Sequence, residues 1–194
     1  LAWLEQLEKT RQDQQQLQQQ LDGAGEEINR NWQQLDRLRQ SAGQPQLPAQ
    51  IRPAELERLT TEQFRELTAL QAELGEVSAL IVRTQTRPER AQLEITTSQK
   101  RIQDISAQLK STREGGKSLL TVEREDALNA ELQALQERNR LRQAELAANS
   151  VLQDLAASKR DLLALKVQLA EDRLQALQKL LSEQRQAASE LAVQ

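Results

Sequence analysis

The segment Gly115–Ser118, with the sequence GGKS, is the part of this chain that most resembles a chemical site. A phosphate-binding loop has the pattern G-x-x-x-x-G-K-[ST], in which backbone N–H groups and the lysine hold the phosphates. The last three residues of the pattern are present, but Ser111 stands where its first glycine is required. A helical pattern, rather than a strand, leads into the segment. We therefore interpret it as a turn between helices. A nucleotide-dependent enzyme, whose ATP binding Lys117→Ala would abolish, is the third of three functional hypotheses.

Three acidic residues form a second candidate, for a divalent cation: Glu123, Glu125 and Asp126. Acidic residues are also expected in the first turn of a helix, where they complement the helix dipole. His and Cys, which supply most transition-metal sites and many catalytic groups, are absent, as are Met and Tyr. We therefore predict no catalytic residue, no metal site, no cofactor and no small-molecule substrate. The chain is predicted not to be an enzyme.

The two tryptophans are candidates for anchors of a binding surface, because tryptophan is enriched at interface hot spots. Trp32 follows the apolar pattern of the first helix, so we predict that it packs within a helical bundle. Trp3 lies near the start of the chain, and both a packed and an exposed position are open for it.

Composition favours long helices and excludes several partners. Only 2% of the 194 residues are aromatic, and the chain has six Gly and four Pro. The 26 basic and 29 acidic residues are interleaved and leave a net charge of −3, so we predict neither a nucleic-acid partner nor an anionic lipid surface. No segment approaches the roughly 20 apolar residues that span a bilayer. The absence of cysteine identifies no compartment.

Leucine recurs at steps of three and four residues, which predicts amphipathic helices that pack through apolar seams. Proline and glycine predict where these helices end, since proline lacks a backbone donor and paired glycines favour helix termini. We predict a first helix at residues 1–40, weakened at Gly23 and Gly25, a linker at 41–53 and helical hairpins at 54–194. Within the hairpins, Thr60 or Thr61 would cap a new helix after a short one at 54–59. The further breaks are predicted at Thr84–Arg90, Gly115-Gly116 and Asn149-Ser150.

The seams also predict partners. The seam from Ala91 to Thr112 is predicted to pack against the helix just before it. The last helix carries two leucine stripes, so it should lie centrally between two partners, and a charge at Leu174 should be the most damaging. The predicted fold is all-α: a single elongated antiparallel helical bundle, or set of coiled-coil hairpins, of about five helices.

Two blocks of sequence resemble a known family. The segment Thr84–Gln92 (TQTRPERAQ) resembles a Q-T-x-P-E-R turn, with one residue more before Pro88 than that pattern has. The segment Asn149–Leu155 (NSVLQDL), with a Lys-Arg pair four residues further on, resembles an N-T-V-L-Q-D block. Both are found in the amino-terminal periplasmic domain, the MscS porin domain, of large mechanosensitive channels, the potassium-dependent type among them. The resemblance covers most of the chain after residue 54.

This resemblance implies a non-catalytic helical domain in the bacterial periplasm, ahead of the transmembrane helices of an inner-membrane channel. Such a channel opens under bilayer tension and relieves osmotic stress. The implied partners are the channel domain of the same chain, the other copies of a heptamer and a component of the cell envelope. Leu1 already lies in a helical pattern and Gln194 follows no helix-ending signal, so we expect the chain to be a piece of a larger membrane protein.

The apolar seams alone support a second hypothesis equally well, namely a self-associating coiled-coil adaptor or scaffold of the cell envelope. Sedimentation separates the two hypotheses in part. A scaffold should dimerise at micromolar concentration, whereas a lone channel domain should stay monomeric.

Overall fold

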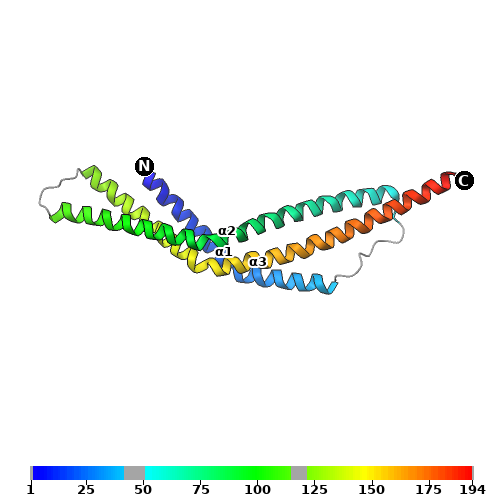
Figure 1. The fold of residues 1–194 in the computed structure, drawn as a ribbon, viewed down its shortest axis with the longest axis horizontal. Coiled ribbons are helices and arrows are strands. Elements are labelled where there is room, and N and C mark those ends of the chain that lie inside the picture. The colour runs from blue at the N-terminus through cyan, green and yellow to red at the C-terminus, as the bar shows by residue number, and fades with distance from the viewer. Residues whose placement is uncertain (1, 42–50, 115–121, 194) are drawn as a thin grey trace. The chain divides into compact units, whose positions relative to one another are not determined.

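The computed structural model describes residues 2–41, 51–114 and 122–193, and all of these except Ile51 and Arg52 are helical. Helix α1 spans Ala2–Ser41, α2 spans Pro53–Glu114 and α3 spans Val122–Val193 (Figure 1). No strand occurs among the described residues, and the predicted all-α class is confirmed. In the same part of the chain, no helix combines the length and the apolar character that crossing a membrane would need.

The described helices number three, so the prediction of about five is wrong. The linker is flanked by helix ends as predicted, since α1 ends at Ser41 and α2 begins at Pro53. The predicted break at Gly115-Gly116 falls between α2 and α3, outside the described residues. By contrast, Thr84–Arg90 lies inside α2 and Asn149-Ser150 lies inside α3. No helix ends at either place.

Local signals for a helix end are overridden at other positions as well. The Thr60 and Thr61 hydroxyls donate to the carbonyls of Leu56 and Glu57, one turn earlier in the same helix, so they do not cap a new helix. In α1 the helix continues through the glycine pair because Ala24, between the two, is fully buried. Burial of a seam residue offsets the cost of about 1 kcal/mol for each interior glycine.

The chain divides into two compact units, which are described separately. Unit 1 comprises Leu1–Gly25 and Val82–Asp154, and unit 2 comprises Glu26–Ile81 and Leu155–Gln194. Each of the three helices contributes one segment to each unit. The two units therefore have separate apolar clusters.

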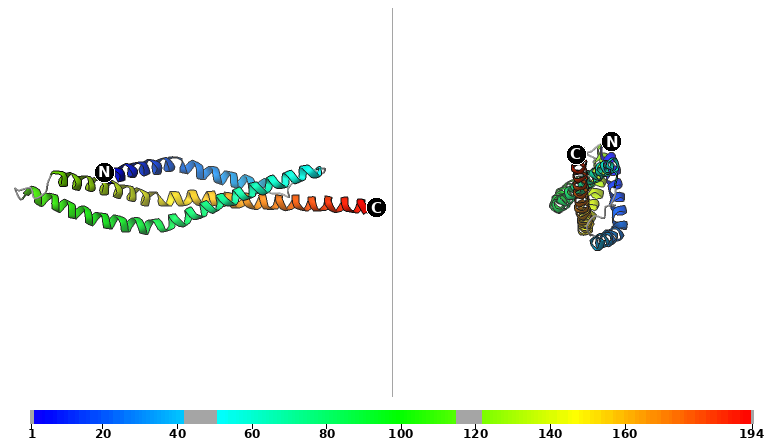
Figure 2. Two further views of the ribbon diagram at one scale, coloured as in Figure 1. Left: turned by 90° about the horizontal axis from the view of Figure 1, so that it is seen from above. Right: turned by 90° about the vertical axis from the view of Figure 1, so that its right-hand side faces the viewer.

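In unit 1, α2 and α3 run antiparallel and pack side by side (Figures 1 and 2). Ile105 and Leu109 of α2 form a cluster with Leu128 and Leu135 of α3. Within the predicted seam from Ala91 to Thr112, the seam residues up to Leu109 are buried or half-buried, but the predicted partner of the seam is wrong. Without a turn at Thr84–Arg90 the helix cannot fold back on itself, so the seam packs against α3.

Helix α1 joins unit 1 through α3, to which it runs parallel. Leu17 forms a buried cluster with Leu141, Ala148 and Leu152 of α3, and Leu21 packs against this cluster. The predicted break at residues 148–151 is therefore wrong for a tertiary reason, because the turn that contains it carries two buried residues of this cluster. Burial of these two residues favours a continuous helix over a new helix that begins at Asn149 or Ser150, because an N-cap typically contributes only about 1 kcal/mol.

In unit 2, α3 contacts both other helices, as predicted from its two stripes (Figure 1). One predicted stripe of α3 packs against α2 in three clusters, through Leu163, Val167, Ala170, Leu174, Leu177 and Leu181. Ala188, the last predicted member of this stripe, is exposed. On its other side, Ser158 accepts a hydrogen bond from Asn31 of α1 at 3.1 Å, and both side chains are buried. One turn further on, Leu35 and Leu162 are buried as well.

Candidate functional site

Among the described residues, the candidates for chemistry are not brought together into a site. Gly115–Ser118 lies outside the described residues, and Ser111 is an exposed residue of α2. Glu123 and Asp126 are exposed in the first turns of α3, and Glu125 is half-buried. Within the described ranges, no group of three or more acidic residues is placed to hold a metal ion.

One of the two tryptophans is placed differently from expectation. Trp32 has 41% of its surface exposed, so the prediction that it packs inside the bundle is wrong. The buried line of α1 passes one residue earlier, through Thr10, Leu17, Ala24 and Asn31 at steps of seven. Trp3 is half-buried.

A proline inside α2 provides the first feature that the structure does assemble. Pro88 has no backbone N–H, so the carbonyl of Thr84, four residues earlier, loses its normal helical donor. Thr84 is 2% exposed, and water does not replace that donor freely. The side-chain amide of Gln153 on α3 donates to this carbonyl at 3.4 Å. The helix can therefore pass through Pro88 because a second helix supplies the missing partner.

Next to this proline, opposite charges on α2 and α3 face each other in three successive rungs, which we call the charge ladder. The rungs repeat every seven residues on both helices. Their shortest nitrogen–oxygen distances are 2.7, 3.2 and 2.7 Å, for Arg87–Glu145, Arg138–Glu94 and Arg101–Glu131 respectively. Arg101 binds Glu131 through two parallel hydrogen bonds.

Arg142 joins two rungs of the ladder into one network. Its Nε donates to Glu94 and its Nη1 donates to Glu145, each at 2.7 Å. Glu145 accepts from Arg87 through its other oxygen, and only 6% of its side chain is exposed. Both oxygens of this buried carboxylate are thus paired with guanidinium groups, as a buried charge requires.

Glu94 is ionised by the same arrangement. Burial, the largest single influence, raises its pKa, but the hydrogen bond and charge of Arg142, followed by those of Arg138, together outweigh burial. The pKa of Glu94 therefore lies below its ordinary value of 4.5. A carboxylate that stays charged at neutral pH keeps the second rung intact.

The ladder specifies the register of the two helices. Charges along α2 run positive, negative, positive, and those along α3 run in the complementary order. A slip of seven residues would place Glu94 opposite Glu145 and Arg101 opposite Arg138, so like charges would meet. The geometry therefore favours one alignment of the hairpin. It offers no nucleophile and no acid–base pair in a cleft.

The sequence interpretation missed these residues, although a signal was present. Arg87, Glu94 and Arg101 are seven apart, and Glu131, Arg138 and Glu145 are also seven apart. Arg138 pairs with Glu94 of α2, whereas its neighbour Arg140 makes an exposed pair with Glu137 within α3. Matching the two heptad series by charge would have identified the correct antiparallel pairing.

The proline lies where the two recognised sequence blocks meet, since Thr84 and Gln153 belong to one block each. Comparison with known proteins identifies a family. A family model described as the mechanosensitive ion channel porin domain matches residues 1–194. The chain belongs to this family. No curated protein and no solved structure matches the chain.

The match to the porin domain confirms the family resemblance and extends it to the first 50 residues, where no sequence block had indicated it. It identifies a channel-associated domain family rather than a catalytic one. It does not single out the potassium-dependent type of channel.

Replacing Gln153 with leucine should destabilise the porin domain by about 1 kcal/mol, because the buried Thr84 carbonyl loses its donor. Pro88→Ala restores a backbone N–H that can donate to this carbonyl, so Gln153→Leu should cost less in that background. Urea unfolding of the four proteins of this cycle measures the difference. An equal cost in both backgrounds would mean that Gln153 acts through other contacts.

Proposed function

We propose that this porin domain is a non-catalytic extracytoplasmic part of a bacterial mechanosensitive channel, where it supports or modulates tension-gated efflux during osmotic stress. The observation that carries the proposal is the family match over all 194 residues. The domain lies in the periplasm, attached to an inner-membrane channel domain encoded in the same chain. It forms a single domain of that larger protein, and the gate lies outside it.

The ladder supports a mechanical role. A domain that modulates a channel by force must keep its helices in register, because helices that slide past each other dissipate the load. In unit 1 the ladder opposes sliding of α2 along α3, since a slipped register places like charges together. In the assembled channel the domain is repeated in a heptamer, and it has a partner in the cell envelope.

Patch-clamp recording of the full-length channel and of a variant that lacks residues 1–194 tests the function. Both proteins should give tension-activated current, and the deletion should change the pressure at which the channel opens. Absence of such current from the full-length protein would contradict the channel assignment. An unchanged opening pressure would contradict the modulating role.

Cysteine labelling tests the location, because the domain has no cysteine of its own. Gln40 is exposed on α1, so Gln40→Cys should react with a membrane-impermeant maleimide in cells with a permeabilised outer membrane and an intact inner membrane. Leu35→Cys is the matched control, because Leu35 is fully buried in the same helix. Labelling of Gln40→Cys only after the inner membrane is lysed would contradict a periplasmic location.

A further inference from the structure

A recess in unit 1, between α1 and α3, is lined mainly by cationic side chains. Its volume is about 260 Å³, and its charged lining residues are Lys9, Arg138, Arg142 and Asp13. Three cations and one carboxylate therefore line one cavity of a chain whose net charge is −3. The remaining lining residues are neutral: Gln6, Thr10, Ala134 and Leu141.

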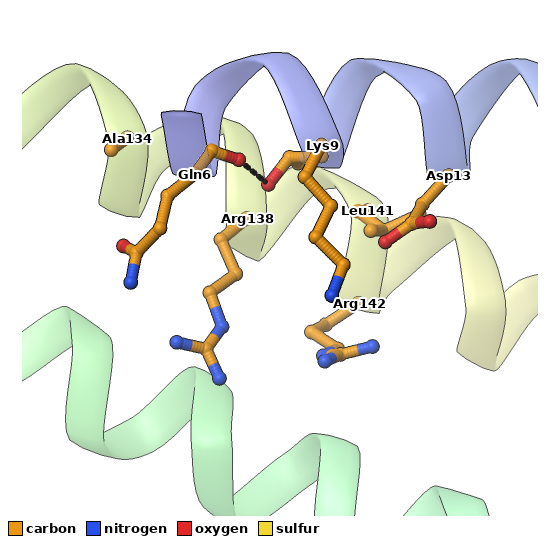
Figure 3. Close-up of a pocket in the computed structure, with 8 residues that line it drawn as sticks. Gln6, Lys9, Asp13, Ala134, Arg138, Leu141 and Arg142 are labelled. Atoms are coloured by element: carbon orange, nitrogen blue, oxygen red, sulfur yellow. Dashed lines mark hydrogen bonds between the residues drawn. The ribbon is translucent and has the colours of Figure 1, made fainter. Parts of the chain in front are cut away.

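The cationic groups approach one another from two helices. Figure 3 shows the Lys9 side chain extending from α1 toward the Arg142 guanidinium of α3, with the Arg138 guanidinium beside it. In the part of the chain that the structure describes, Lys9 has no carboxylate partner. Glu94 and Glu145 already pair with the two guanidiniums, so Lys9 supplies the positive charge of the recess that an anion would neutralise.

The ladder holds the two guanidiniums in place and leaves some of their donors unused. Glu94 accepts from Nη2 of Arg138 and from Nε of Arg142, and Glu145 accepts from Nη1 of Arg142. Among the described residues, nothing accepts from Nε and Nη1 of Arg138 or from Nη2 of Arg142. These fixed donors, together with Lys9, form a preorganised set for an oxygen-rich anion.

We propose that this recess binds a phosphate group, either as a free anion or as part of a lipid headgroup. A phosphate presents oxygens in several directions and can accept from three cationic groups on two helices, whereas a carboxylate presents two oxygens in one plane. The volume accommodates such a group with bound water, since one water needs only about 10–15 Å³ measured with a water-sized probe. Asp13 is the one acidic side chain in the lining, and it opposes the bound anion.

Binding at this place links α1 to α3. In the part of α1 that precedes Leu17, the described contacts with α3 include a long hydrogen bond of 3.4 Å from the Gln14 side chain to the carbonyl of Glu137. A phosphate held by Lys9 and by the two arginines adds charge-assisted bonds across the same interface. The ligand therefore stabilises the docked position of the first turns of α1.

Calorimetric titration of inorganic phosphate into the 194-residue chain at low ionic strength tests the site. Lys9→Gln should weaken binding by about tenfold, the effect of losing one charge-assisted hydrogen bond. Asp13→Asn should tighten binding by about threefold or more, because it removes the repulsive charge. Arg11→Gln is the matched control: it removes a positive charge from an exposed position of the same helix outside the recess, so it should change affinity by less than about twofold.

Vesicles distinguish the two sources of phosphate. Phosphatidylcholine vesicles with and without phosphatidylglycerol are sedimented with the chain and with Lys9→Gln. If the phosphatidylglycerol vesicles retain the unmodified chain but not Lys9→Gln, the ligand is a lipid headgroup. If inorganic phosphate binds and these vesicles do not retain the chain, the ligand is a free anion. The proposal is overturned if neither probe binds, or if Lys9→Gln and Arg11→Gln weaken binding equally.

Discussion

Glu145→Ala should destabilise unit 1 of the porin domain by about 2–3 kcal/mol. Removing one partner of a buried ion pair typically costs about 3–5 kcal/mol, because the remaining charge is left without compensation. Here Glu145 is 6% exposed, whereas its partners Arg87 and Arg142 are 40% and 25% exposed and can partly rehydrate. The expected loss therefore lies below the range for a fully buried pair.

The two tryptophans allow this loss to be assigned to a unit, since Trp3 belongs to unit 1 and Trp32 to unit 2. In a Trp32→Phe background, urea unfolding followed by Trp3 fluorescence should show a lowered midpoint for Glu145→Ala. The matched control is Arg140→Ala in the same unit, which breaks a solvent-exposed pair with Glu137 and should cost only a few tenths of a kcal/mol. Equal effects of the two substitutions would show that the ladder contributes no more than surface pairs.

The apolar periodicity of the sequence predicted the buried faces but not the ends of the helices. The stripe from Leu163 to Leu181 packs against α2 as a single face. The sequence predicts such a face because a repeat of three and four residues follows from the geometry of one helix. The end of a helix depends on what other helices supply. Gln153 compensates for Pro88, and it lies 65 residues further along the chain (153 − 88).

The predicted pairing of the helices failed for the same reason. A turn at Pro88 would have paired residues 91–112 with the helix just before them, whereas a continuous α2 must pair with α3. The network around Glu94 depends on that pairing, since its partners Arg138 and Arg142 are 44 and 48 residues away. Single-helix patterns contain no information about such distances. The heptad spacing of alternating charges on α2 and α3 does contain information about which residues of the two helices are paired.

The second large effect is expected in unit 2, where Leu177→Ala should cost about 3 kcal/mol. Leu177 is 1% exposed and packs with Ile51 and Leu56 where the chain enters α2. The Ile51 carbonyl there accepts a hydrogen bond from Gln184 at 2.9 Å. Truncating a buried leucine costs about 2–5 kcal/mol, through lost burial and the cavity that remains.

We expect truncation at Leu177 to be more damaging than truncation at Leu174, because Leu177 is the more deeply buried of the two. A charge at Leu174 was predicted to be the most damaging change, but Leu174 is 8% exposed, whereas Leu177 and its neighbour Leu56 are almost fully buried. Unfolding followed by Trp32 fluorescence in a Trp3→Phe background measures the effect in unit 2. Leu80→Ala is the control, since Leu80 belongs to the same unit and is 47% exposed, and it should change stability by less than about 0.5 kcal/mol. A loss below about 1 kcal/mol at Leu177 would contradict a close-packed cluster at the start of α2.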